Sequence, residues 1–280
     1  MSTVAEAVSI ARPHLSAMRH RPAPQPRGRP PLPDTELVAD IRAVVADVPT
    51  YGYRRVHALL RREAEKTRRE APNPKRVYRV MKVHGLLLQR GGERREERRH
   101  DGRVAVDLRN TRWCSDGLEI TCDNGEKVRV VFALDCCDRE AMGHVATTGR
   151  ITAEDGQDSM VATVEHRYGK VNRVPEPIEW LTDNGSCDTA RTTRAFARGI
   201  GLIPRTTPVS SPQSNAMAKT FIRTLKCDYV RVKPRPDAQS VIAQLPGWFA
   251  HYNEVHPHRA LRYRSPREFI AQTCEALSGL

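Results

Sequence analysis

Apolar side chains recur at helical spacing in three segments between residues 34 and 85. The first segment follows Asp34, a residue type that caps helices, and its apolar positions are Leu37, Ile41, Val44, Val45 and Val48. The second segment carries Tyr53, Val56, Leu59 and Leu60. The third begins at Asn73-Pro74, which suits an N-cap and first turn, and Gly85 can end it. The pattern predicts a small unit of three helices.

The third predicted helix separates apolar from basic side chains. One face carries Val77, Val80, Met81 and His84. The opposite face carries Lys75, Arg76, Arg79 and Lys82. A basic face on the last helix of a small helical unit fits insertion along DNA, as in helix-turn-helix proteins. A solvated charged face would give the same pattern, so that alternative stays open.

From residue 107 the pattern changes to alternating strands and helices. Strand-like runs are predicted at about 112–121, 127–135, 141–147, 178–182 and 201–206. Helices are predicted at about 153–168, 188–199, 238–251 and 265–276. The first three strands are consecutive, which favours an antiparallel part of the sheet. This order predicts an α/β fold with a ribonuclease H-like mixed sheet flanked by helices.

Composition narrows the class of partner. The chain has 280 residues, a formal net charge of +13 and a pI near 9.8, which favour a polyanion such as nucleic acid. No run reaches 18 apolar residues and the N-terminus lacks the apolar core of a signal peptide, so we expect no membrane or secreted location. The seven cysteines include no CxxC pair, which indicates a reducing cytoplasm.

Two aspartates follow or lie in predicted strands. Asp116 falls in the first strand, and Asp183 opens the turn Asp183-Asn184-Gly185 after the strand at 178–182. Taken alone, such a turn needs no function. Ser211-Pro212 predicts a helix start, and one face of that helix carries Asn215, Lys219, Ile222 and Lys226. We expect Trp113 and Trp180 to be core rings beside the aspartates.

The spacing of these positions resembles the D, D(35)E triad of retroviral-integrase-like transposases, because 35 residues separate Asp183 from position 219. Other segments match in the same order: Tyr51 to Arg55, Asn110 to Thr121, Phe132 to Asp135, Trp180 to Ser186, Ser210 to Met217, His251 to Asn253 and Ser265 to Glu268. The chain resembles the second-reading-frame (OrfB) product of a bacterial insertion sequence.

The resemblance implies a polynucleotidyl transferase that cuts and joins DNA. It implies that Asp116 and Asp183 hold Mg²⁺ or Mn²⁺, with two ions in an intact site. It assigns DNA positioning to Asn184, Asn215, Arg223 and Lys226. The implied partners are the element ends and target DNA, further copies of the chain, and a first-frame (OrfA) protein, and the implied location is the bacterial cytoplasm, on nucleoid DNA.

Lys219 stands where the family carries glutamate. Its ammonium has three donors and no acceptor, and it adds positive charge where cations should bind. The next acid along, Asp228, lies about 180° around a helix with 100° per residue. Ala216 replaces the usual glycine and would be strained at positive φ. Two functions stay open: a transposase impaired by Lys219, or an inactive DNA-binding remnant or accessory subunit. A general metal nuclease is a third, against which the flanking segments argue.

Two other groups could suggest metal ligands. Cys136 and Cys137 are adjacent and cannot easily share one tetrahedral ion, which favours a strand end. His251, His256 and His258 have no cysteine nearby, which favours packing and hydrogen bonding.

These patterns divide the chain into four predicted parts. Residues 1–33 combine a short helical stretch at 7–17 with a proline-rich linker. Residues 34–88 form a helical DNA-binding domain, and residues 89–106 form a linker rich in arginine and glutamate. Residues 107–280 form the integrase-like catalytic core with C-terminal helices.

Overall fold

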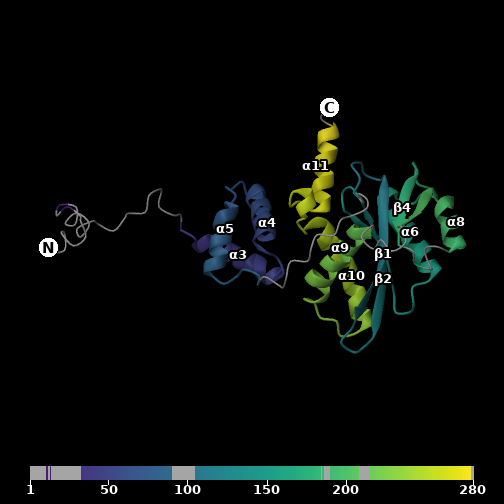
Figure 1. Ribbon diagram of the computed structural model, residues 1–280, viewed down its shortest axis with the longest axis horizontal. Helices are drawn as coiled ribbons and strands as arrows, with labels where there is room; N and C mark the ends of the chain where they lie inside the picture. Colours follow the sequence, from purple (N-terminus) through teal and green to yellow (C-terminus); the bar gives the residue numbers. More distant parts are fainter. Residues whose placement is uncertain are drawn as a thin grey trace. The chain divides into compact units, whose positions relative to one another are not determined.

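The computed structural model describes residues 33–89, 105–183, 185, 190–207 and 215–278, with Ala11 and Pro13 (Figure 1). Most of the helical stretch predicted at 7–17, most of the proline-rich linker, most of the charged linker and the helix start at Ser211-Pro212 lie outside these residues. Residues Leu37–Leu280 form one structural unit and Met1–Glu36 another. All contacts below lie within the larger unit.

Three helices follow one another as predicted. They are α3 (Thr35–Asp47), α4 (Tyr53–Lys66) and α5 (Pro74–Val83). Their shared core includes Leu37, Ile41, Val56, Leu60, Val77, Val80 and Met81. The Asn73 side chain accepts a hydrogen bond from the backbone nitrogen of Lys75 at 2.8 Å, and Gly85 has φ +66°, so both predicted helix ends are confirmed. His84 differs from the prediction, because it is the exposed C-cap residue.

Five strands form one mixed sheet in the order β3-β2-β1-β4-β5. They are β1 (Arg112–Thr121), β2 (Lys127–Asp135), β3 (Ala141–Thr147), β4 (Ile178–Thr182) and β5 (Leu202–Thr206). β2 pairs antiparallel with β1 and β3, whereas β4 pairs parallel with β1 and β5. The predicted strands and the antiparallel first part of the sheet are confirmed.

Helices cover both faces of the sheet (Figure 1). On one face, α6 (Ala153–Tyr168) and α8 (Arg191–Gly199) enclose a core that contains Trp113 and Trp180. These two rings are 0% and 2% exposed and meet edge to face at 6.4 Å, so both are core rings as predicted. On the other face, α9 (Ala216–Leu225) and α10 (Ala238–Glu254) pack on Phe132 and Leu134 of β2.

The C-terminal part continues from α9 through a π-helical turn. This turn, η2 (Lys226–Val230), follows directly on α9, so the regular 100° spacing expected to include Lys226 ends at Leu225. A 3₁₀ turn, η3 (Arg259–Leu261), and α11 (Pro266–Ser278) complete the fold. Within the described residues, no helix combines the length and apolar character needed to span a bilayer.

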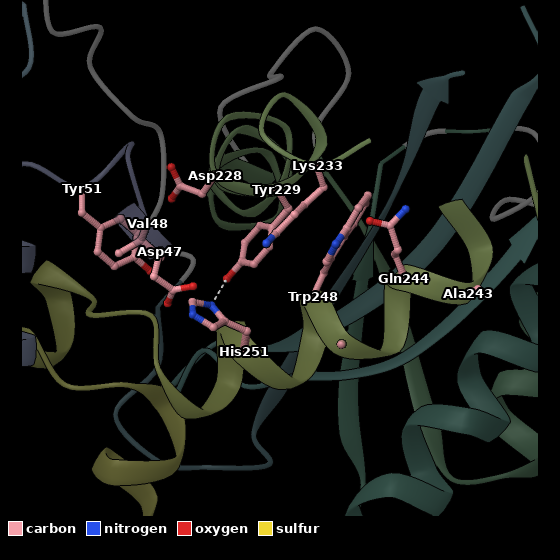
Figure 2. A pocket seen from close by; sticks show the side chains of 11 residues that line it. Asp47, Val48, Tyr51, Asp228, Tyr229, Lys233, Ala243, Gln244, Trp248 and His251 are labelled. Carbon is pink, nitrogen blue, oxygen red and sulfur yellow. Dashed lines mark hydrogen bonds between the residues drawn. The ribbon is translucent and has the colours of Figure 1, made fainter. Parts of the chain in front are cut away.

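Side chains of α4 and its preceding loop contact the region that follows α9. Arg55 forms an ion pair with Asp228 at 3.0 Å, and the Tyr51 hydroxyl lies 2.9 Å from His256 Nδ1. The Tyr229 hydroxyl similarly lies 2.9 Å from His251 Nδ1, beside a cavity of about 400 Å³ (Figure 2). The predicted packing and hydrogen bonding are confirmed for His251 and His256, whereas His258 packs against the rings of Tyr252 and His256 and its Nε2 has no hydrogen-bond partner among the described residues. Cys136 and Cys137 lie in the turn that follows β2.

Candidate active site

The parallel pairing of β1 with β4 aligns the two aspartate positions. Trp113 pairs with Trp180 and Cys114 with Leu181, and the same offset of 67 positions separates Asp116 from Asp183. Asp116 lies within β1, and Asp183 directly follows β4. Both side chains are half-buried. The register therefore brings two carboxylates to one end of β4.

The pKa of Asp116 depends on its burial and on the charges of Asp183 and Lys219. Burial raises the pKa of Asp116, and a hydrogen bond from the backbone nitrogen of Gly117 at 2.8 Å opposes this. The charge of Asp183 raises the same pKa further, whereas the charge of Lys219 lowers it. Like charges close together disfavour ionisation, and an opposite charge favours it. The carboxyl of Asp116 thus lies within electrostatic reach of both Asp183 and Lys219.

Asp183 sits in the turn that the sequence predicts. Its Oδ1 accepts a hydrogen bond from the backbone nitrogen of Gly185 at 3.0 Å. This is the local bond by which aspartate stabilises a turn. Asn184, a predicted DNA contact, lies outside the described residues. Asp183 directly follows Thr182, the last paired residue of β4.

A hydrogen bond connects the start of α9 to β1 beside Asp116. The Nδ2 of Asn215, which precedes α9, donates a hydrogen bond to the carbonyl of Ser115 at 2.9 Å. Asn215 is only 1% exposed, so it anchors the helix and does not face solvent as a DNA contact would. Ala216 begins α9 and is not among the described non-glycine residues with positive φ, so the strain expected for alanine does not arise.

Lys219 is exposed on the first turns of α9. Within the described part of the chain, no group of three or more His, Cys, Asp or Glu side chains could hold a metal ion. Asp228 cannot supply the third acid, since its side chain is 6% exposed and bound to Arg55. Asp116 and Asp183 offer the oxygen ligands that suit one hard divalent cation. The ammonium of Lys219 does not fit a second cation, because it is itself positively charged.

The predicted DNA contacts on α5 form an open surface. Lys75, Arg79 and Lys82 are exposed and Arg76 is half-buried, while the apolar residues of the same helix are buried. The basic face is therefore available to solvent. On α9, Arg223 is exposed, and Lys226 is half-buried at the helix end.

A buried ionic network at the end of β2 was not predicted from the sequence. Arg167 of α6 contacts Asp135 at 3.2 Å, Asp138 at 3.3 Å and Glu140 at 3.0 Å, and all three carboxylates are almost fully buried. Trp113 Nε1 also donates to Asp135 Oδ2 at 3.2 Å. The closely spaced acids after a buried strand were the available signal. Their arginine lies 27 or more positions away, so local pattern could not reveal the pairing.

Comparison with known proteins agrees with this architecture. Residues 32–94 match a family model described as HTH-like domain, and residues 107–212 and 201–266 match two models described as integrase core domain. A chain of the simian T-cell lymphotropic virus intasome, solved in complex with PP2A regulatory subunit B56 gamma, has a similar structure, with a TM-score of 0.50 and 14% identity. That similarity covers 71% of this chain and 66% of the intasome chain, and it shows the fold.

Curated relatives are much closer in sequence. Transposase InsD for insertion element IS2A/D/F/H/I/K from Escherichia coli is 53% identical over 248 residues, which are 88% of this chain and 82% of the relative. Transposase InsD for insertion element IS2-9 from Escherichia coli strain K12 is 53% identical over the same share of this chain and 80% of the relative. This chain therefore belongs to the OrfB-type insertion-element transposases, a family of polynucleotidyl transferases with an integrase core.

Proposed function

We propose that this transposase carries a DNA-cleaving and DNA-joining site that Lys219 impairs. The observation that carries the proposal is the alignment of Asp116 with Asp183 across β1 and β4, with the charge of Lys219 acting on the same carboxyl. In this proposal Asp116, Asp183 and position 219 are the three catalytic positions. The site then retains two of its three acidic ligands.

Asp116 and Asp183 would together hold one divalent cation, Mg²⁺ or Mn²⁺. When bound, such an ion stabilises negative charge on phosphodiester oxygens during an in-line displacement. The raised pKa of Asp116 reflects a site where negative charge is concentrated and partly removed from water, which favours a cation. Lys219 opposes a second cation because its charge has the same sign. A rate loss of several orders of magnitude is expected from the missing electrostatic stabilisation.

Exposed cations would hold the DNA around this site. Lys75, Arg76, Arg79 and Lys82 on α5 would contact phosphates, as would Arg223 and Lys226 at the far end of α9. Asn184, the next residue after Asp183 in the sequence, is a further candidate contact. Joining an element to a target brings two element ends together, which favours assembly of several copies of the chain. A first-frame (OrfA) protein is a proposed partner from the family resemblance.

A second candidate function is that of a DNA-binding subunit without catalysis. The positive charge of Lys219 at the position of the third acid favours it, together with the exposed basic face of α5. Such a chain would bind element ends, alone or beside intact protomers, and would neither cut nor join them.

The two candidates are separated by restoring the missing acid. Strand cleavage and joining are measured on element-end DNA with Mg²⁺ for the unmodified chain, Asp183→Asn, Lys219→Glu, Lys219→Gln and Lys219→Glu/Asp183→Asn. We expect Lys219→Glu to raise the rate at least about 100-fold, Lys219→Gln to give far less, and the double variant to lose the gain. Activity in the unmodified chain that disappears in Asp183→Asn would mean that another group replaces the third carboxylate. Activity absent from every variant would favour the subunit without catalysis.

A further inference from the structure

A groove of about 490 Å³ lies apart from the two aspartates, where α4 and α5 meet the turn around Tyr263. Its walls include three tyrosines and three nitrogen-bearing side chains: Tyr53, Tyr78, Tyr263, Arg54, His57 and Lys75. The volume is in the range of pockets that hold small organic ligands. It is large enough for a single nucleotide.

Two of the tyrosines form an aromatic platform on the helical unit. The rings of Tyr53 and Tyr78 meet edge to face, with centroids 5.1 Å apart. Tyr78 is 41% exposed, although it lies on α5 between the buried Val77 and Val80. Its ring is therefore not needed to fill the helical core. Exposed aromatic rings beside basic groups are what single-stranded nucleic acids stack on.

The third tyrosine comes from a strained turn of the C-terminal region. Arg262 and Tyr263 are consecutive non-glycine residues in the left-handed region, with φ of 55° and 62°. Such residues cost free energy and concentrate at ligand-binding sites. The turn is held by the backbone of His258, which bonds Tyr263 N at 2.7 Å and pairs with Arg264. The fold therefore maintains an unfavourable backbone that keeps Tyr263 in the wall of the groove.

Arg54 connects the aromatic groups across the groove. Its Nε donates to the Tyr53 hydroxyl at 3.1 Å, and hydrogen bonds to the hydroxyls of Tyr53 and Tyr263 raise the pKa of the guanidinium. Lys75 is exposed at the same groove, and Arg259 and Arg262 are exposed on the turn. Among the described residues that line the groove, every charged side chain is basic. The groove thus combines ring faces with a positive rim.

We propose that this groove binds one unpaired nucleotide of DNA. The base stacks against Tyr78 and Tyr53 and contacts Tyr263 in the groove wall, and Arg54 and Lys75 contact the adjacent phosphates. The inference rests on the proposed function, because it assumes that the chain handles DNA ends. It adds a site that distinguishes an unpaired end from a continuous duplex.

The test compares the affinity of the full chain for two DNAs with the same element-end sequence, one blunt and one with a single-stranded dT overhang. Binding is measured by fluorescence anisotropy without divalent ions, and a 2-aminopurine in the overhang reports stacking. We expect the overhang DNA to bind about tenfold more tightly and to show quenched 2-aminopurine. Tyr78→Ala and Tyr263→Ala should each remove most of this preference, whereas Tyr78→Phe, which retains the ring, should keep it.

Two control variants on α5 separate the groove from the general basic face. Val83→Ala removes an apolar side chain that is 75% exposed and should leave both affinities unchanged. Arg79→Ala should lower the affinity for both DNAs by the same factor, because a phosphate contact does not depend on the overhang. Equal affinity of the unmodified chain for the two DNAs, or a preference that survives both tyrosine-to-alanine changes, would overturn the groove proposal and leave the proposed function standing. Failure to bind either DNA would overturn both.

Discussion

Two clusters of carboxylates occupy different parts of the same sheet. In the ionic network at the end of β2, Asp135, Asp138 and Glu140 are buried and share Arg167. At the candidate active site, Asp116 and Asp183 are half-buried and have a lysine within electrostatic reach. The carboxylates of the first cluster share a planar guanidinium that donates several hydrogen bonds. The second leaves its carboxylates at a solvent-accessible edge, where an external cation can bind.

Converging acids alone do not identify a metal site. The two clusters differ in burial: the network carboxylates are buried in ion pairs with arginine, whereas Asp116 and Asp183 are half-buried. In the network Arg109 adds to Arg167, with its Nε 2.9 Å from Asp138 Oδ2. By this criterion the network stabilises the fold, and in our proposal the aspartate pair serves the reaction.

The largest expected effect is on the network. Arg167→Met would leave three buried carboxylates without their main partner, and we expect the free energy of unfolding to fall by about 3–5 kcal/mol. Lys219→Met, at an exposed position, should change it by less than about 0.5 kcal/mol. Urea denaturation of both variants measures the difference. Equal, small effects would show that the two clusters are not energetically distinct.

Neutralising one aspartate in each cluster should give a smaller but still unequal effect. Asp135→Asn removes acceptors for Trp113 Nε1 and for Arg167, and we expect a loss of about 2–3 kcal/mol. Asp183→Asn keeps the shape of the turn and removes like-charge repulsion with Asp116, so stability should change by less than about 0.5 kcal/mol. Thermal or urea unfolding tests this. A large loss in Asp183→Asn would assign that carboxylate to the fold.

The smallest expected effect is a change of the free energy of unfolding with pH. It arises from histidines that belong to neither carboxylate cluster. Burial lowers the pKa of His258 to about 3 and, with the charge of His258, lowers the pKa of His256 well below its usual value. Both histidines are neutral when folded and take up protons when unfolded. Their stabilisation is therefore complete above about pH 6.5 and decreases as pH falls, by up to about 1.4 kcal/mol per pH unit for each.

This pH dependence is measured by urea unfolding at pH 7 and pH 5.5. His258→Gln should reduce the difference between the two pH values, and Lys219→Met should not. An unchanged difference in His258→Gln would mean that other groups cause the loss at acid pH.

Local pattern was sufficient for most of the fold. The strands at 112–121, 127–135 and 141–147 were predicted with the observed bounds, because turns separate short runs of apolar residues. The two aspartates could be selected only through their resemblance to a family. Register then explains their proximity, since parallel pairing of β1 and β4 joins segments 67 positions apart.

Other features depend on contacts that spacing does not encode. Asparagine is a residue type that can contact DNA, yet the side chain of Asn215 is buried against Ser115, 100 positions away. The groove around Tyr263 joins residues more than 180 positions apart. Tyrosines and arginines so far apart in the sequence form no local pattern, so the groove could not be predicted from the sequence.

The central claim is that Asp116 and Asp183 hold one cation and that Lys219 excludes a second. Titration with Mn²⁺ followed by electron paramagnetic resonance, on the chain bound to element-end DNA, measures the number of bound ions directly. The unmodified chain and Lys219→Gln should bind one ion, Lys219→Glu should bind two, and Asp116→Asn/Asp183→Asn should bind none. Two ions in the unmodified chain, or one ion that persists in the double aspartate variant, would contradict the account.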